Sequence, residues 1–208
     1  MKVDVLNING KAAGRSVDLP DNIFGVEPNE HAIYLAVKSY NAAQRQGTHK
    51  AKERGEIAGS TRKIKKQKGT GTARAGSIKS GVFKGGGRMF GPRPRTYSVK
   101  LNKKVKTLAR ASALSQKMSN GEIKVVEDFT FDQPKTSEMH NVISSLALNG
   151  QKSVFVTTDV DKNLYLSARN LAKSGVVPAQ NLNVYDILNA NTIVFSEGAI
   201  EKLKESFK

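Results

Sequence analysis

The sequence predicts an α/β fold, in which a mainly parallel sheet carries helices on both faces and a long basic loop leaves the body. Three observations predict it. Short apolar runs alternate with helical apolar stripes through the C-terminal half. A strand-like run and a striped helix also stand near the N-terminus. Between them, over residues 47–101, no hydrophobic period survives, and so long a stretch is either functional or disordered; we expect it to be functional.

The N-terminal elements are a strand over residues 3–8 and a helix over residues 29–46. Ile33, Val37 and Tyr40 share one face of that helix. Two elements are too few to fold alone, so we expect them to join the C-terminal sheet. Residues 1–46 and 102–208 are therefore predicted to form one body, with residues 47–101 as an excursion from it.

The C-terminal part repeats the alternation of strand and helix. Asn102 can cap a helix that reaches residue 118, with Val105 and Leu108 facing inward. Asp159 and Asp161 follow a strand and are interpreted as caps of the next helix. The remaining expected elements are a strand over 123–126, a helix marked by Met139, Val142, Ile143 and Leu146, a strand over 153–157, a helix striped by Leu164, Ala168 and Leu171, strands over 182–185 and 192–195, and a terminal helix from Ser196 with Ile200, Leu203 and Phe207 inward.

Positive charge is concentrated in the middle of the chain. Lys and Arg number 34 against 18 Asp and Glu, a formal net charge of +16. Residues 41–110 hold 20 of these cations and only two carboxylates, Glu53 and Glu56, and residues 57–121 hold no carboxylate. Solvated helix faces mix both signs and charged tails are terminal, so this internal run indicates a polyanionic partner. Nucleic acid is preferred to an anionic membrane because the run lacks an amphipathic apolar face.

The chain has no cysteine, which excludes a disulfide framework and a thiolate metal site. The N-terminus lacks an apolar run of signal-peptide length, and no stretch approaches the apolar length of a membrane span. We therefore expect a soluble, cytoplasmic protein.

Residues 68–81 contain a GxG pattern that superficially resembles a dinucleotide-binding loop. That fingerprint needs a preceding apolar strand and an acid about 20 residues later, whereas the next acid is Glu122. The glycines instead supply a backbone that can approach phosphates closely, beside cations that bring charge; a flexible linker is the alternative. The residues of this pattern are Lys68, Gly69, Gly71, Arg74, Gly76 and Lys79.

Residues 83–97 combine three successive glycines with two arginines bracketed by prolines. Pro92 and Pro94 fix φ, so Arg93 and Arg95 are expected to point outward from a stiff backbone and to lose little freedom on binding phosphate. This composition is not that of a linker and favours RNA.

Three aromatic residues lie in the same stretch, and Phe83, Phe90 and Tyr97 could stack on unpaired bases. For Phe90 and Tyr97 we favour the alternative that they anchor the base of the loop against the body. A basic helix follows, whose first turns hold cations that the helix dipole disfavours unless a phosphate relieves them. These cations are Lys103, Lys104, Lys106 and Arg110.

Catalysis finds little support in the sequence. Metal-assisted phosphodiester chemistry needs clustered carboxylates, and the three histidines are scattered. No phosphate-binding GxxxxGK[ST] loop and no GxSxG elbow is present. We expect no catalytic residue, no metal and no cofactor. The alternative, an RNA-acting enzyme with a basic guide loop, requires a polar pocket at the carboxyl ends of the strands.

Three ordered motifs, at residues 68–80, 85–97 and 102–115, resemble the signature of the universal large-subunit ribosomal protein L-four family. The resemblance implies a Rossmann-like body and a loop threaded through large-subunit rRNA to the wall of the peptide exit tunnel. Residues 65–74 would reach the tunnel constriction. Thr72, Gly81 and the pair Ile64-Lys65 depart from the common pattern, so the role of the loop carries over but the detailed contacts of its tip do not. The implied tip is Gln67, Lys68, Gly69, Thr70, Gly71 and Thr72.

The predicted function is that of a structural, rRNA-binding constituent of the large ribosomal subunit that aids its folding and assembly in translation. Expected partners are large-subunit rRNA, neighbouring large-subunit proteins and the nascent peptide near the loop tip, with no membrane and no second copy of the chain. The residues expected to bind RNA are Arg62, Lys63, Lys65, Lys66, Lys68, Gly69, Gly71, Arg74, Lys79, Lys84, Gly85, Gly86, Gly87, Arg88, Arg93, Arg95, Lys103, Lys104, Lys106 and Arg110.

Overall fold

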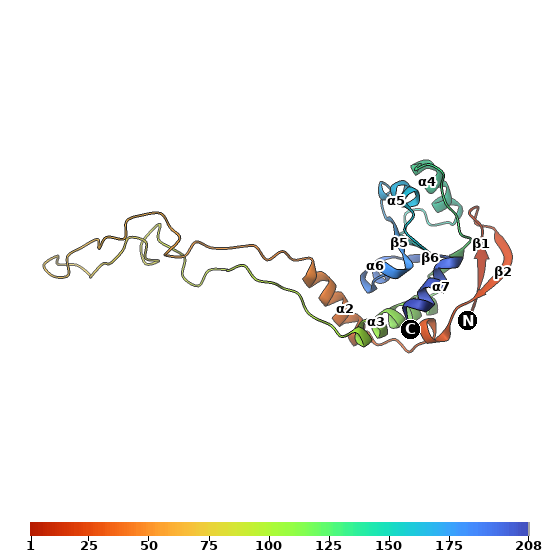
Figure 1. Cartoon of the computed structure of the whole chain (residues 1–208), viewed down its shortest axis with the longest axis horizontal. Helices are drawn as coiled ribbons and strands as arrows, with labels where there is room; N and C mark the ends of the chain where they lie inside the picture. The colour runs from red at the N-terminus through yellow and green to blue at the C-terminus, as the bar shows by residue number, and fades with distance from the viewer. Residues whose placement is uncertain (208) are drawn as a thin grey trace. The chain divides into compact units, whose positions relative to one another are not determined.

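The computed structural model describes residues 1–207 of the chain and divides them into two compact units (Figure 1). One unit, here called the body, comprises residues 1–41 together with the residues from 100 onward. The other, here called the basic segment, comprises Ala42–Val99. Among residues 1–207, no helix combines the length and the apolar character needed to cross a bilayer.

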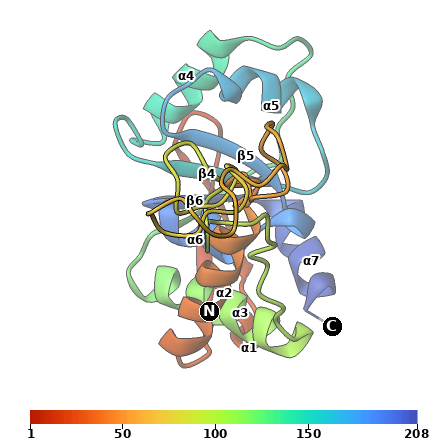
Figure 2. The same ribbon diagram turned by 90° about the vertical axis from the view of Figure 1, so that its left-hand side faces the viewer.

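A six-stranded sheet forms the centre of the body, in the order β2-β1-β3-β6-β4-β5. Only β1 and β2 pair antiparallel, and every other neighbouring pair is parallel. Figure 2 shows β6, β4 and β5 side by side, as this order requires. The predicted α/β class with a mostly parallel sheet is confirmed. The strands are β1 (Lys2–Leu6), β2 (Ala12–Asp18), β3 (Ile123–Val126), β4 (Ser153–Thr157), β5 (Ser174–Pro178) and β6 (Thr192–Ser196).

Helices cover both faces of this sheet because successive strand residues point to opposite sides. In β6, Ile193 and Phe195 enter one buried cluster and Val194 the other. The first cluster takes in residues of α1, α2, α3, α6 and α7, and the second takes in α4 and α5. The helices are α1 (Asp21–Phe24), α2 (Glu30–Ala43), α3 (Lys103–Ser119), α4 (Thr136–Ser145), α5 (Lys162–Arg169), α6 (Val184–Asn189) and α7 (Glu197–Ser206).

Several expectations for the body are confirmed and several are wrong. The strands over 123–126 and 153–157 and the terminal helix after Ser196 form as predicted. The strand over 182–185 does not form, because the Asn183 side chain accepts a hydrogen bond from the Asp186 amide at 2.8 Å and starts α6 there instead. The strands β2 and β5 were not predicted. Leu108, expected inward, is 40% exposed, while its neighbour Ala109 is fully buried.

Two expected helix caps also need correction. Asn102 occupies the N-cap position of α3, but its side chain makes no capping hydrogen bond, and only its carbonyl accepts from the Lys106 amide at 3.1 Å. Asp161 does cap α5, since its carboxylate accepts from the amides of Asn163 and Leu164 at 2.9 and 3.1 Å. Asp159 does not cap that helix.

The basic segment holds little regular structure. Between Ala43 and Lys103, all of it within the described part of the chain, no helix or strand forms, and Lys63 and Ser77 make one isolated antiparallel bridge. Main-chain hydrogen bonds nevertheless join the two halves of the segment. Residues 47–56 and 87–97 are here called the inner arms, and residues 57–80 are called the distal stretch. The candidate interface is built on these two parts.

Candidate nucleic-acid interface

The inner arms run antiparallel and are held by main-chain hydrogen bonds. The Arg95 amide donates to the Gly47 carbonyl at 3.1 Å, the Ala51 amide to Pro92 at 3.0 Å, and the Arg88 amide to Lys52 at 2.9 Å. Proline lacks an amide hydrogen, yet its carbonyl still accepts, so Pro92 fits the ladder on the acceptor side. The sequence therefore forms a paired stem here without the apolar alternation of a hairpin.

Tyr97 joins the ends of the two arms. Two guanidinium groups lie over its ring, that of Arg45 at 3.7 Å and that of Arg95 at 4.5 Å from the ring centroid. Its hydroxyl lies 3.4 Å from Nε2 of His49. Cations over an aromatic face are attracted by its quadrupole, so this arrangement stabilises the paired ends. Tyr97 was expected to anchor the loop against the body, but its contacts here are with Arg45, His49 and Arg95, all within the basic segment.

The two carboxylates of the segment neutralise inner-arm cations. Glu53 pairs with Nε of Arg93, and Glu56 pairs with Nζ of Lys50. The hydrogen bond from Lys50, followed by one from the Glu53 amide, lowers the pKa of the Glu56 carboxyl. The expectation that Arg93 and Arg95 simply point outward is therefore revised: Arg93 is 73% exposed but paired, and Arg95 lies over Tyr97.

The glycine triplet at residues 85–87 lets the chain cross itself closely. The Gly87 amide donates to the Lys79 carbonyl at 3.0 Å, and a Cβ at Gly87 would lie 2.4 Å from the Arg54 amide nitrogen. A Cβ at Gly86 would lie 1.9 Å from the Ser80 carbonyl oxygen. At both positions a side chain would clash with the chain's own backbone, so glycine is favoured there whether or not RNA is bound.

The distal stretch folds back on itself around its tip. The Ile64 amide donates to the Gly76 carbonyl at 2.9 Å, and Lys65 Nζ donates to the Thr72 hydroxyl at 2.7 Å. Gly69, at the tip, has a φ of +80°, and a Cβ there would meet nothing within 4 Å. Its main chain is therefore open to close approach by another molecule.

The structure brings several predicted RNA-binding cations together in the distal stretch. Arg62, Lys63, Lys65 and Lys66 line a concavity of about 650 Å³ with Ser60, Ile64 and Ile78. Among residues 1–207, no carboxylate lies within ion-pair distance of any cation of residues 57–80. Like charges held together without counter-charges repel one another, and bound phosphates would relieve that repulsion.

The second predicted set of cations lies in the body, on α3. Lys103, Lys104 and Lys106 are exposed in its first turns, and the first turn holds no acidic residue. Arg110 differs from them, because its guanidinium lies 4.9 Å from the Phe207 ring centroid. Burial lowers the pKa of the Arg110 guanidinium. Arg110 thus helps pack the body's C-terminal helix.

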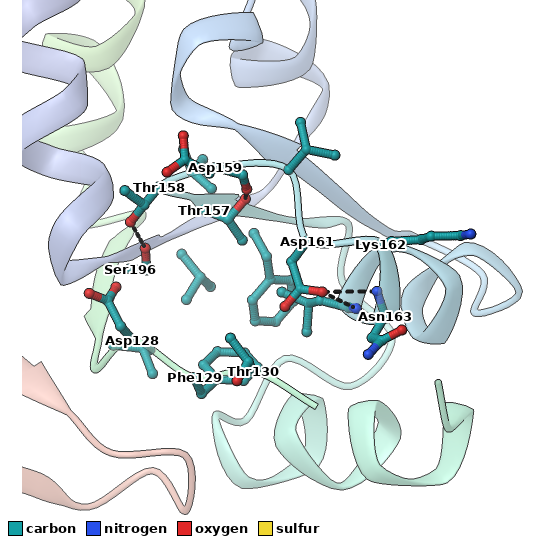
Figure 3. A pocket seen from close by; sticks show the side chains of 16 residues that line it. Asp128, Phe129, Thr130, Thr157, Thr158, Asp159, Asp161, Lys162, Asn163 and Ser196 are labelled. Carbon is teal, nitrogen blue, oxygen red and sulfur yellow. Dashed lines mark hydrogen bonds between the residues drawn. The ribbon is translucent and has the colours of Figure 1, made fainter. Parts of the chain in front are cut away.

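A cavity of about 510 Å³ in the body lies at the carboxyl ends of β3, β4 and β6 (Figure 3). This is where the enzymatic alternative requires a polar pocket. Each carboxylate labelled there has a structural partner. Asp161 caps α5, Asp159 pairs with Lys202 at 3.3 Å, and both Asp128 oxygens accept from the Gly198 amide at 3.2 Å. Within residues 1–207, no three His, Cys, Asp or Glu gather as metal ligands.

Sequence reasoning missed two features of the interface. Arg45 was not among the expected site residues, although it lies closer to the Tyr97 ring than Arg95 does. Phe90 was expected to anchor the loop, but its ring is fully exposed, so that interpretation is wrong. The high density of Arg and aromatic residues was the only sequence signal for either.

Comparison with known proteins agrees with this picture. A model of the ribosomal protein L4/L1 family matches residues 17–206. The chain is 61% identical over 206 residues to the large ribosomal subunit protein uL4 of Flavobacterium psychrophilum, covering 99% of both chains. It is 52% identical over 208 residues to that of Porphyromonas gingivalis, covering both chains completely. With a family match across most of its length and full-length relatives of this identity, the chain belongs to the ribosomal protein L4/L1 family.

Proposed function

We infer that this chain is a structural constituent of the large ribosomal subunit that binds rRNA, works in translation in the cytoplasm and has no catalytic activity of its own. Its full-length relatives carry the name of a large-subunit ribosomal protein. Other proteins of the large subunit are its neighbours. The observation that carries the rRNA-binding role is the run of cations in residues 57–80 without a single carboxylate partner.

We further propose that residues 47–101 act as one RNA-penetrating loop of a single Rossmann-like body made of residues 1–46 and 102–208. The parallel β3, β6, β4 and β5 with helices on both faces support the Rossmann-like description. The paired inner arms support the loop, because they hold its two ends together.

The tip of this loop, Gln67–Thr72, is proposed to reach the peptide exit tunnel, where the nascent peptide passes. The open main chain at Gly69 and the cations around the distal concavity suit a narrow passage between phosphates. The body is proposed to act as one copy, without homo-oligomer formation, since its binding partner is the polyanion.

Deleting the loop tests its role. A short Gly-Ser linker can replace residues 48–94, because the flanking residues Gly47 and Arg95 are already joined by a 3.1 Å hydrogen bond. Both buried clusters of the body draw only on residues outside this range. The variant should therefore unfold cooperatively in urea, whereas the salt dependence of its affinity for large-subunit rRNA should fall steeply, since it lacks 13 of the 34 cations. A folded variant with an unchanged salt slope would contradict the proposal.

The position of the tip has a separate test that uses the absence of cysteine in the chain. Thr70→Cys places a single thiol at the tip, and Tyr165→Cys places one on α5 as the matched control. In large subunits assembled with each variant, a thiol-directed cross-linker should join Thr70→Cys to a stalled nascent peptide and leave Tyr165→Cys unjoined. Failure of the Thr70→Cys variant to cross-link would place the tip elsewhere.

A further inference from the structure

Phe90 has an unusual conformation for a bulky apolar residue. Its backbone φ is +53°, in the left-handed region that L-residues other than Gly, Asn and Asp rarely adopt. Its side chain is fully exposed. No aromatic ring or guanidinium of residues 1–207 packs on it. The folded chain therefore holds an apolar ring in water on a disfavoured backbone and gains no contact from it.

The flanking hydrogen bonds explain how this conformation is held. The Arg88 amide donates to Lys52, and the Pro92 carbonyl accepts from Ala51. Adjacent residues on one arm thus face residues 88 and 92 on the other, so the residues between them must bulge outward. A Cβ at Gly91 would lie 2.6 Å from the Ala51 Cβ, so the bulge is pressed against the opposite arm at its far end. Its apex, Phe90, is pushed away from the stem.

The surroundings of the ring indicate its occupant. Arg88, two residues before Phe90, and Lys84, six residues before it, are exposed cations, as is Lys52, whose carbonyl accepts from the Arg88 amide. The carboxylate next to Lys52 in the sequence, Glu53, is already paired with Arg93. An apolar surface of a protein would meet these charges unfavourably. An unpaired nucleotide instead presents a flat base for the ring and a phosphate for the cations.

We propose that Phe90 is a base-stacking residue, whose ring receives an unpaired base of large-subunit rRNA while Arg88 and Lys84 contact the adjoining phosphates. The proposal rests on the proposed rRNA-binding function and adds a recognition mode to it. Cations alone bind the uniform backbone, whereas a stacking ring selects places where a base is free. The bulge at residues 88–92 thus sets the position of the segment along the RNA.

The absence of tryptophan from the chain provides a direct test. Phe90→Trp introduces the only indole of the protein, and an indole stacked on a nucleobase loses fluorescence. Titration of the full-length variant with purified large-subunit rRNA should quench its emission. Tyr165→Trp, on α5, provides the matched control and should keep its emission. If the Phe90→Trp variant binds rRNA without quenching, the proposal is overturned. It is also overturned if purified large-subunit proteins quench the emission and rRNA does not.

Two further variants separate the ring from the backbone. Phe90→Gly accepts a positive φ and so keeps the bulge while removing the ring. Its affinity for large-subunit rRNA should fall about 5- to 150-fold, the effect of losing one base–aromatic stack, with an unchanged salt slope. Phe90→Tyr keeps the ring and should bind as the parent chain does. If Phe90→Gly binds as tightly as the parent chain, stacking is refuted. If the affinity of the parent chain for large-subunit rRNA does not depend on salt, the rRNA-binding function is refuted instead.

Discussion

The clamp formed by Tyr97 predicts a local but measurable loss of order when its ring is removed. In the Tyr97→Ala variant, the contacts with Arg45 at 3.7 Å and Arg95 at 4.5 Å disappear, together with the 3.4 Å contact to His49. Two partly exposed cation–π contacts of roughly 0.5–1 kcal/mol each, with a weak hydrogen bond, give a total of about 1–2 kcal/mol. The paired ends of the arms should therefore open about 5 to 30 times more often.

Hydrogen exchange at the Arg95 amide measures this opening, because that amide donates to the Gly47 carbonyl. Its protection should fall by the same factor in Tyr97→Ala, while the free energy of global unfolding in urea stays unchanged, since Tyr97 belongs to neither buried cluster. Tyr97→Phe, which keeps the ring, is the matched control and should retain most of the protection. Unaltered exchange in Tyr97→Ala, or a loss of global stability, would refute this reasoning.

Substitutions at three further residues test the body. Lys117→Met should lower the free energy of unfolding in urea by about 2 kcal/mol, because Lys117 Nζ donates to the Ala190 carbonyl at 2.7 Å and pairs with Glu122 at 2.5 Å. Asp161→Ala should cost about 1 kcal/mol by removing the cap of α5, and Asp161→Asn only a small part of that. Burial raises the pKa of the Asp186 carboxyl, so the folded state holds this proton more tightly than the unfolded chain. The contribution of Asp186 to stability should therefore fall as pH rises through the raised pKa, and Asp186→Asn should flatten that part of a urea-unfolding pH profile.

Sequence reasoning found the central strands β3, β4 and β6, whose residues are largely buried. The strands β3 and β4 read as short apolar runs because helices cover both of their faces. By contrast, β2 is mostly exposed and pairs along one edge only, so its residues carry no apolar pattern. The other edge strand, β5, ends in Pro178 and is nowhere fully buried, which an edge tolerates. Edge strands therefore escaped prediction for a physical reason.

The candidate interface divides in the same way between charge and geometry. The local excess of Lys and Arg can be counted from the sequence, and it located the interface. The pairing of Glu53 with Arg93 and the contact of Arg45 with Tyr97 join residues 40 and more positions apart, so no spacing rule could reveal them. The positive φ of Phe90 could not be predicted either, because it is imposed by hydrogen bonds on each side of the bulge.

The central claim is that the unpaired cations of the distal stretch grip rRNA, and the salt dependence of binding tests it most directly. One variant replaces five distal lysines by glutamine: Lys63, Lys65, Lys66, Lys68 and Lys79. The control replaces five exposed cations of the body: Lys2, Lys11, Lys162, Arg169 and Lys204.

Both variants lose the same formal charge, so the comparison isolates where the charge lies. Each phosphate contact to a single strand contributes about 0.7 to the slope of log affinity against log salt. The distal variant should therefore lose about three to four units of slope on large-subunit rRNA, and the control much less. Equal slopes for the two variants would contradict the account, because the grip would then follow total charge and not the distal stretch.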